Sequence, residues 1–302
     1  MKIADLTEDK MPVLGLKCLV MSCEEREARN GNGYLAGILA DTEGLIDFKI
    51  WDNVPIMKTL MVPGKAIQVT QGMVEEYKGK MSVKIASAAM LDDSEVENYI
   101  PTSYMTAEEV ENEVLNLLPE EIRTYNLDID PIIESLKKMG IINDFLSAPA
   151  GIRMHHAYRR GLITHSIEIV NLARSVAQTM LKDPGVKLDM GVLLTAALFH
   201  DVGKLLEYEK NDVGLFLGFT PNGHLQGHSF IGAAMLNSIL HKKLPKDRLI
   251  NLTHCLISHH GNPDWGAAVP PKTAEALILH HCDMLSSHTL NKCEQSTDIF
   301  GK

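Results

Sequence analysis

Histidine is absent from the first 154 residues of this 302-residue sequence, and all thirteen histidines lie between His155 and His288. An even scatter would not leave half of the chain without this residue type. The distribution therefore predicts two parts with different chemistry, of which the second uses the histidines. The length agrees, because about 150 residues per domain is the usual expectation.

Long apolar segments without charge are also lacking, which argues against a membrane-spanning helix. The first ten residues, MKIADLTEDK, contain acidic residues and no apolar core of a secretory signal, so we expect a cytoplasmic protein that does not act at a membrane. No C-x-x-C pair occurs, which favours reduced thiols and argues against a structural zinc ribbon. The five cysteines are Cys18, Cys23, Cys255, Cys282 and Cys293.

An excess of basic residues is missing as well. The chain has 29 Lys and Arg against 39 Asp and Glu, a formal net charge of −10. Proteins that bind polyanions usually present a basic face, so this balance argues against broad electrostatic binding of nucleic acid. A local basic patch or bound metal ions could still reverse the field inside one site.

Strand-like alternation of apolar and polar positions is present in residues 12–88. Two hairpins are predicted, one in residues 34–52 and one that turns at Lys78-Gly79, and a short helix at residues 54–61 separates them. Five strands with a helix between the third and the fourth is the order of an oligonucleotide-binding (OB) barrel. We therefore predict an OB-like, five-stranded β-barrel that binds single-stranded nucleic acid over residues 1–91.

An acidic, polar segment at residues 92–105 is predicted to be a linker. Thr106 and Glu109 then form a T-x-x-E capping box, which marks the start of a helix. Beyond it, apolar residues recur with a period near 3.6, so we predict an all-α helical bundle over residues 106–302. The predicted helices include residues 162–180, 190–200, 228–240, 248–260 and 273–288.

Side chains of the types that bind metals lie on the apolar stripes of these helices. His165 lies three residues after Leu162 and four before Ile169, so it faces the core. A single histidine in such a place is more often a hydrogen-bonded core residue than a ligand. One shared partner nevertheless explains all of these positions more simply than several unrelated partners do. The other positions are His228, His259 or His260, Asp283 and the helix end His200-Asp201.

That partner is most simply a metal centre, because imidazoles and carboxylates suit divalent ions and helical bundles hold them between facing helices. The ligands exceed what one tetrahedral ion uses, so we infer two ions with an aspartate that could bridge them. Two ions about 3.5–4 Å apart are the usual clamp for phosphate-ester hydrolysis. Lys204, three residues after Asp201, could hold a phosphate oxygen or protonate the leaving group. A solvated lysine beyond a helix end is an equally good interpretation.

The helical part resembles the HD superfamily of metal-dependent phosphohydrolases, and the neighbourhoods LQGHS and SHHG resemble its two-metal branch. More narrowly, the segments HHAYRRGLITHS, LFHDVGK, GHLQGHS and ISHHGNP behind an OB-like domain resemble the YhaM-type 3′-5′ exoribonucleases. The likeness extends from about residue 12 to residue 288. The ordered H…HD…D set consists of His165, His200, Asp201 and Asp283.

This resemblance implies a nuclease that trims single-stranded RNA from its 3′ end, with single-stranded DNA as a second candidate substrate. It also implies stimulation by manganese, with iron, magnesium, cobalt or zinc as alternatives, and a catalytic role for Asp201 and Lys204. One metal would be held by His165, His200, Asp201 and Asp283. The second would be held by Asp201, His228 and His259, with His260 as a further or alternative ligand.

One departure from the family pattern lies just before the L-x-x-H segment. The family usually has two glycines there, and here the first is Arg160, beside Arg159. A guanidinium near the metal could grip a phosphate or narrow the access. Arg159, Arg160 and the neighbouring His156 are therefore candidate substrate contacts, although adjacent arginines are more often solvated. His224, His280 and His281 receive no role.

Aromatic side chains are scarce, at 5% of the chain, so the few in the predicted barrel are informative. Barrels of this type bind single strands by stacking bases on aromatic rings. Alternation puts Phe48 and Ile50 on one face and Trp51 on the other. Tyr34 and Trp51 are the selected candidates.

Other interpretations remain open at this point. The same centre could hydrolyse nucleotides or cyclic nucleotides, although a small substrate needs no strand-binding barrel. The ligands could instead hold a mixed-valence di-iron oxygenase centre. From a different class, the chain could be a non-catalytic single-strand binder with a structural metal. In each case the protein could form a homo-oligomer.

Overall fold

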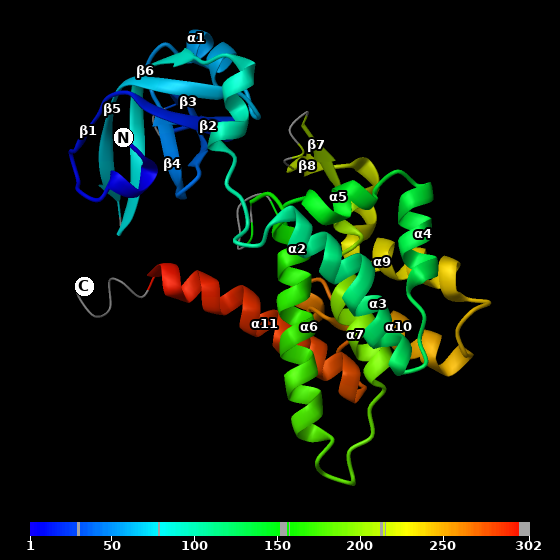
Figure 1. The fold of residues 1–302 in the computed structure, drawn as a ribbon. Coiled ribbons are helices and arrows are strands. Elements are labelled where there is room, and N and C mark those ends of the chain that lie inside the picture. Colours follow the sequence, from blue (N-terminus) through cyan, green and yellow to red (C-terminus); the bar gives the residue numbers. More distant parts are fainter. Residues whose placement is uncertain are drawn as a thin grey trace. The chain divides into compact units, whose positions relative to one another are not determined.

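The computed structural model describes residues 1–28, 31–77, 79–151, 156, 158–211, 214 and 216–295, and side chains up to residue 289. The chain divides into two compact units, a strand-rich one and a helical one (Figure 1). The first comprises Met1–Thr102 with Lys210–Leu217, and the second comprises Ser103–Glu209 with Gly218–Lys302.

The first unit is a closed five-stranded barrel. Its strands pair in the order β5-β2-β3-β4-β6, and pairing of β5 with β6 closes the ring. The β4–β6 pair is parallel and the other four are antiparallel, so the predicted OB-like barrel is confirmed. The elements are η1 (Ile3–Asp5), β1 (Pro12–Val13), β2 (Leu16–Glu27), β3 (Gly33–Asp41), β4 (Gly44–Ile50), α1 (Val54–Leu60), β5 (Ala66–Tyr77) and β6 (Lys80–Met90).

Alternation along β4 decides which side chains fill the barrel. Phe48 and Ile50 are buried, whereas Trp51 is 38% exposed and stacks on Tyr34 with ring centroids 4.3 Å apart. The predicted turn at Lys78 lies outside the described residues. Gly37 on β3 is required by close packing, because a Cβ there would lie 1.9 Å from the carbonyl oxygen of Ser22.

The segment predicted as a linker, residues 92–105, contains the 3-10 helix η2 (Asp93–Tyr99). Val96 and Ile100 are buried there in an apolar cluster with Leu19 and Met21 of the barrel. The boundary between the two units falls between residues 102 and 103, inside this segment.

Helices make up most of the second unit, and its first helix begins at the predicted capping box. Thr106 Oγ1 accepts from the Glu109 backbone N–H, and the Glu109 carboxylate accepts from the Thr106 N–H. The first elements are α2 (Ala107–Asn112), the π-helical turn η3 (Glu113–Leu117), α3 (Leu118–Thr124), α4 (Asp130–Lys138) and α5 (Ile142–Ser147). They are followed by α6 (Gly161–Met180), α7 (Met190–Phe199), α8 (Lys204–Glu207), α9 (Pro221–Leu240), α10 (Lys246–Ser258), η4 (Pro263–Trp265) and α11 (Ala274–Gln295).

α7 is the central helix of this unit. Every one of its residues is buried, because it is apolar on all sides, and it packs against α6, α10 and α11. A short hairpin, β7 (Tyr208–Lys210) and β8 (Phe216–Phe219), was not predicted from the sequence. Within the described part of the chain, no helix combines the length and apolarity needed to cross a membrane.

Candidate metal centre

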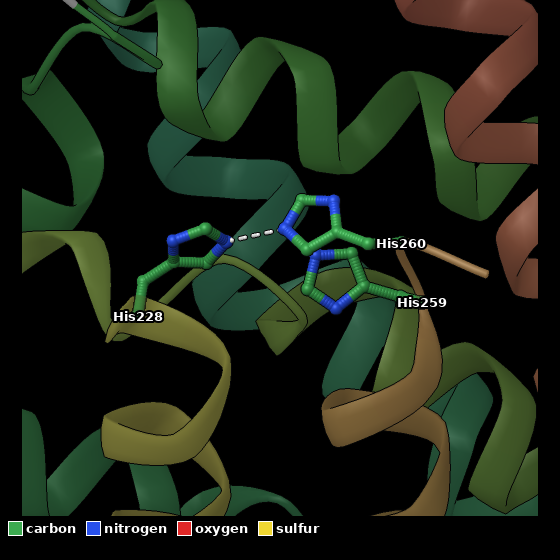
Figure 2. Close-up of side chains that lie close together, drawn as sticks. All are labelled: His228, His259 and His260. Atoms are coloured by element: carbon green, nitrogen blue, oxygen red, sulfur yellow. Dashed lines mark hydrogen bonds between the residues drawn. The ribbon is translucent and has the colours of Figure 1, made fainter. Parts of the chain in front are cut away.

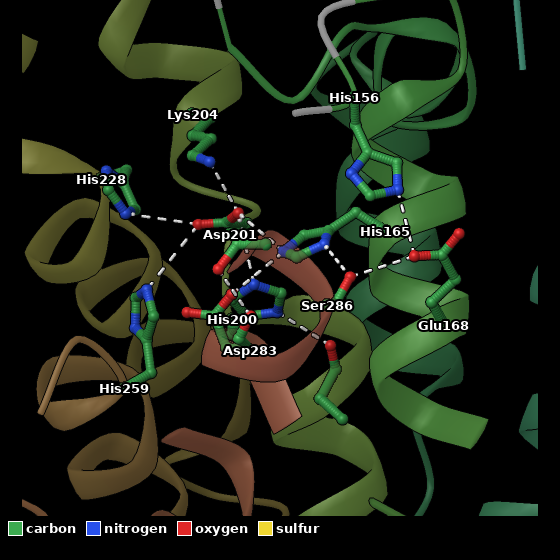
Figure 3. A network of polar contacts seen from close by, with 12 residues as sticks. His156, His165, Glu168, His200, Asp201, Lys204, His228, His259, Asp283 and Ser286 are labelled. Carbon is green, nitrogen blue, oxygen red and sulfur yellow. Dashed lines mark hydrogen bonds and ion pairs between the residues drawn. The ribbon is translucent and has the colours of Figure 1, made fainter. Parts of the chain in front are cut away.

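The predicted ligands come from five helices or helix ends of the second unit and converge on one buried position (Figure 3). His165 lies in the second turn of α6, His200 and Asp201 follow the last residue of α7, and His228 lies in α9. His259 and His260 follow α10, and Asp283 lies within α11. The side chains nearest the middle are almost fully buried: His165, His200, Asp201 and His259 are at most 2% exposed.

Asp201 lies at the middle of this group, and its two carboxylate oxygens face different ligands. Oδ2 is 3.3 Å from Nε2 of His200 and 3.9 Å from Nε2 of His165. Oδ1 is 3.3 Å from Nε2 of His228 and 3.8 Å from Nε2 of His259. One carboxylate therefore connects two sets of imidazoles, as a bridging ligand would.

Asp283 and Lys204 both lie on the side of the group that Asp201 Oδ2 faces. Asp283 Oδ1 is 3.2 Å from Nε2 of His165, and Lys204 Nζ is 2.7 Å from Asp201 Oδ2. The lysine is the first residue of α8, one turn after the aspartate, and its side chain is only 13% exposed. A buried ammonium beside a carboxylate places a positive charge on the wall of the site.

His260 also faces the group (Figure 2), with Nε2 3.0 Å from Nε2 of His228. Two unprotonated nitrogens would repel each other at this distance, so a proton or a cation must lie between their lone pairs. The histidines His228, His259 and His260 can direct one nitrogen each toward a common ion. The sequence left His259 and His260 as alternatives, and both lie at the site.

Hydrogen bonds to the backbone determine which ring nitrogen is free to bind a metal. Nδ1 of His200 is 2.9 Å from the carbonyl oxygen of Ala197, and Nδ1 of His259 is 2.7 Å from that of Leu256. A carbonyl only accepts, so Nδ1 carries the proton and Nε2 of each neutral ring is left with a lone pair. These two Nε2 atoms and Asp201 Oδ1 are buried without a hydrogen bond among the described residues. Such orphaned acceptors are rare in folded proteins, and coordination of divalent metal ions would satisfy all three.

A second layer of side chains holds His165 in place. Nδ1 of His165 is 3.2 Å from Ser286 Oγ, and that hydroxyl donates to Glu168 Oε2 at 3.0 Å. Because the hydroxyl proton is used toward Glu168, the serine accepts from His165, whose Nε2 then faces the centre. His156 Nε2 bonds the same carboxylate oxygen at 3.0 Å.

His228 is held by a carboxylate that the sequence analysis did not select. Glu207 is 4% exposed, and its Oε2 accepts from Nδ1 of His228 at 3.0 Å. Its Oε1 accepts from the backbone N–H of His228 at 2.8 Å. That N–H is free of the helix because Gly227 has a non-helical φ of 71°. Glu207 therefore orients both the ring and the backbone of this ligand, as outer partners of metal-bound histidines do.

Close packing explains why the HDVGK segment has a glycine at position 203. Gly203 has an ordinary helical φ of −63°, so backbone conformation does not require glycine there. A Cβ at this position would lie 2.0 Å from the carbonyl oxygen of His228. The absence of a side chain therefore lets α9 approach the turn that carries Asp201.

The electrostatics keep the ligands in metal-binding protonation states. Burial would raise the pKa of Asp201, but Lys204 and His200 hold it well below its usual range. Burial and the neighbouring His228 lower the pKa of His260 to about 4, and burial lowers the pKa of His259 well below its ordinary value. His200 differs, because Asp201 outweighs burial and raises its pKa. A bound cation would take the place of the proton on His200.

The centre opens into a cavity of about 440 Å³, within the usual range for small-ligand sites. Five of the predicted site residues line it, together with four that the sequence analysis did not select. The first are His165, Asp201, Lys204, His260 and Asp283. The second are Trp265, Met284, Ser287 and His288.

The other predicted substrate contacts lie elsewhere. The side chain of His156 is fully buried against Glu168, and Arg160 donates from Nε to the carbonyl oxygen of Met105 at 2.9 Å. Neither these residues nor Arg159 belong to the lining of the cavity as described. Tyr34 and Trp51 lie on the barrel, in the first unit.

Of the histidines without a predicted role, His280 now has a contact. Its Nδ1 donates to the carbonyl oxygen of His259 at 2.7 Å, which anchors the backbone of a candidate ligand. His281 lies beside His280, and the ring of His224 lies 6.2 Å from that of Phe219. His155 lies outside the described residues.

Comparison with known proteins agrees with this geometry. The family model described as HD domain matches residues 162–287. Proteins named 3′-5′ exoribonuclease YhaM are similar along most of the chain. The one from Bacillus licheniformis is 28% identical over 277 residues, 90% of this chain and 84% of the relative. The one from Bacillus subtilis is 29% identical over 271 residues, 89% of this chain and 83% of the relative.

Solved structures match each unit separately and only loosely. The OB domain of MM0293 from Methanosarcina mazei is 27% identical, with 32% of this chain and 87% of that chain covered and a TM-score of 0.27. The HD domain of the Listeria monocytogenes phosphodiesterase PgpH is 20% identical, with 42% and 67% covered and a TM-score of 0.30. The resemblance predicted from the motifs is confirmed by the sequence comparisons: residues 162–287 match the HD domain model, and about nine-tenths of the chain is similar to the proteins named 3′-5′ exoribonuclease YhaM.

Proposed function

We propose that this protein is a metal-dependent 3′-5′ exoribonuclease, which hydrolyses single-stranded RNA at a centre of two divalent ions. The HD domain and the YhaM relatives support a metal-dependent hydrolase. The observation that carries the two-ion proposal is the position of Asp201, which directs one oxygen toward each set of imidazoles. Manganese is the ion we expect because the resemblance to the YhaM-type exoribonucleases implies it; imidazole and carboxylate ligands together also suit iron and zinc.

Each ion has a complete set of protein ligands in this proposal. The first is held by His165, His200, Asp201 and Asp283. The second is held by Asp201, His228, His259 and His260. The buried, unpaired Nε2 atoms of His200 and His259 support this division, because one of them lies in each set.

The chain's own residues position the substrate and manage its charge. When bound, the divalent ions would neutralise phosphate charge and lower the pKa of a bound water toward neutral. Lys204 extends its ammonium into the cavity wall beside Asp201, where it can contact a phosphate oxygen or donate a proton to the leaving oxygen. A cavity of about 440 Å³ suits one nucleotide, as removal of single nucleotides from an end requires.

The barrel would bind the single strand upstream of the cleaved nucleotide. Its stacked pair, Tyr34 and Trp51, leaves the tryptophan partly exposed on the barrel surface. An exposed ring of this kind stacks on any base, so it binds single strands without sequence preference. Stacking on the ring does not itself depend on the net charge of −10, although barrels that bind single strands usually add a basic groove along the backbone.

The test is incubation of the purified protein with 5′-labelled and 3′-labelled single-stranded RNA, with manganese and after chelation. We expect a ladder of shortening products from the 5′ label and immediate release of mononucleotide from the 3′ label, both only with metal. The variant Asp201→Asn keeps the shape of the side chain and removes the bridging charge, so its activity should fall by about 100- to 1000-fold, the order of loss seen when a charge-stabilising group is removed.

The matched control is Asp264→Asn, an exposed aspartate of the loop after His260 that does not line the cavity. It should retain full activity. RNA that stays intact in every lane would contradict the exoribonuclease proposal. Hydrolysis of mononucleotides or cyclic nucleotides in parallel reactions would then favour a small-substrate phosphohydrolase. Single-stranded DNA in the same assay determines the range of polymers.

A further inference from the structure

The lining of the cavity divides into two kinds of chemistry. Metal ligands and Lys204 supply the charged part, whereas Trp265 and Met284 supply large apolar side chains. Met284 directly follows the candidate ligand Asp283 in the chain, and Trp265 lies five residues after the candidate ligand His260. A substrate that reaches the metal centre therefore also meets an aromatic ring and a thioether.

Trp265 is exposed although it is among the largest apolar side chains of the unit. It is 58% exposed, at the end of the short 3-10 helix η4. Exposed apolar residues are common by themselves. This one is distinguished by its position in the wall of the cavity that also contains Asp201 and Lys204.

The backbone that carries Trp265 is fixed by hydrogen bonds. Its N–H donates to the carbonyl oxygen of Asn262 at 2.9 Å, and the Asn262 side chain accepts from the N–H of Asp264 at 3.0 Å. The N–H of Ala268 donates to the carbonyl oxygen of Ile257, which ties the loop back to α10. The backbone position of Trp265 is thus set before any ligand binds, which lowers the entropy cost of ordering this loop on binding.

We propose that Trp265, with Met284 in the lining of the same cavity, binds the base of the 3′-terminal nucleotide whose phosphodiester lies at the metal centre. This proposal rests on the proposed exonuclease function and adds the subsite for the base. An indole stacks on the face of any base, and a methionine side chain adapts to rings of different size.

The same subsite predicts weak selectivity among the four bases. To distinguish one base from another, a site needs hydrogen-bonding groups directed at the edge of the base. Among the described lining residues outside the ligand set, Lys204 is paired with Asp201 and the Ser287 hydroxyl donates to the carbonyl oxygen of Asp283. The exposed imidazole of His288 and the indole N–H of Trp265 remain, which are too few groups to distinguish four bases. We therefore expect the cavity to recognise that a base is present rather than which base it is.

The test compares two RNA substrates that differ only in whether the 3′-terminal ribonucleotide carries a base. The full-length wild type should prefer the normal RNA over the abasic one by about 5- to 150-fold in kcat/KM, the range expected for one stacked base. Trp265→Ala should lower kcat/KM by that factor on normal RNA and should leave kcat/KM on abasic RNA almost unchanged. Trp265→Phe should restore most of the preference, because a phenyl ring still stacks.

Leu285→Ala provides the matched control. Leu285 is 54% exposed on α11, next to Met284, and does not line the cavity as described. Its substitution should leave both substrates unaffected.

A binding measurement gives a readout that does not depend on turnover. Calorimetry on the magnesium-loaded full-length protein should show tighter binding of adenosine 5′-monophosphate than of ribose 5-phosphate, and Trp265→Ala should remove the difference.

Three results would overturn the base subsite. Trp265→Ala could leave the normal substrate unaffected, or it could impair normal and abasic RNA equally, as a merely structural residue would. The two ligands could also bind the wild type equally well. In all three cases the wild type still degrades RNA, so the proposed function stands. A wild type that degrades neither RNA would overturn the function together with the subsite.

Discussion

At the scale of single residues, Asp201 organises the centre because its two oxygens face different imidazoles. The ligands around it depend in turn on residues that never face the cavity. His200 and His259 are oriented by backbone carbonyls, His165 by Ser286, and His228 by a carboxylate. Each of these contacts leaves Nε2 as the metal-binding atom.

Glu207 provides the clearest test of this outer layer. A glutamine in its place loses the negative charge and replaces one acceptor oxygen by an NH2 group, which can only donate and would face the ring Nδ1–H or the backbone N–H of His228. Glu207→Gln should lower the affinity for the second ion by about 10- to 100-fold. Competition with a metal-binding dye measures this affinity and the number of ions bound.

Glu209→Gln is the control, because Glu209 is exposed on β7, two residues away. It should bind both ions as the wild type does. Equal affinities for the two variants would show that Glu207 does not position the ligand.

The shifted pKa values of the buried histidines predict how the free energy of unfolding of the metal-free protein changes with pH. The folded-state pKa of His260 is lowered to about 4, below the pKa of about 6.5 of an unfolded histidine. Between these values the unfolded chain binds a proton that the folded chain does not, so the free energy of unfolding falls as pH falls. Each such group contributes up to about 1.4 kcal/mol per pH unit.

The lowered pKa values of His259 and His165 also make the free energy of unfolding fall as pH falls. The raised pKa of His200 has the opposite effect on it. Denaturant unfolding of the chelated protein between pH 7 and pH 4.5 measures the slope. His260→Gln should make the slope smaller, because glutamine has no proton to gain. An unchanged slope would mean that His260 titrates normally in the folded chain.

At the scale of elements, the HDVGK turn and α9 must approach closely for His228 to reach Asp201. Gly203→Ala should force them apart, because its Cβ would overlap the carbonyl oxygen of His228. We expect a loss of about 1–3 kcal/mol in the free energy of unfolding and weaker metal binding.

Gly218→Ala on β8 is the comparison, because a Cβ there meets no atom within 4 Å. Gly218→Ala should change neither the free energy of unfolding nor the metal affinity. Thermal unfolding and metal titration should detect a loss of both in Gly203→Ala. Full metal affinity in Gly203→Ala would show that the two elements can separate without disturbing the ligands.

At the scale of the whole molecule, the proposed function assigns the binding of the strand to the barrel and its cleavage to the helical unit. If the barrel binds RNA upstream, its contribution should depend on substrate length. Trp51→Ala should lower kcat/KM on a long single strand by about 5- to 150-fold, the range for one stacked base, and leave a dinucleotide substrate unaffected.

Leu45→Ala serves as the control, since Leu45 is an exposed apolar residue on β4 of the same barrel. It should behave as the wild type on both substrates. Equal losses on the long strand and the dinucleotide would contradict a length-dependent role for the barrel.

The sequence by itself determined the order of the strands, the main helices and the convergence of the histidines. These follow from alternation and from the 3.6-residue period, which are local properties of the chain. Thus Phe48 is buried and Trp51 exposed as alternation predicts, and His165 lies on the inward stripe of α6.

Only the tertiary structure decided which residues support the centre and which line its cavity. Glu207 is 21 residues from His228, and Ser286 is 121 residues from His165, so no local pattern connects them. Glu168, one turn after His165, was the one partner that helical spacing could have indicated. The burial of His156 and the exposure of Trp265 were likewise decided by packing between distant segments, because burial depends on what the rest of the chain places over a residue.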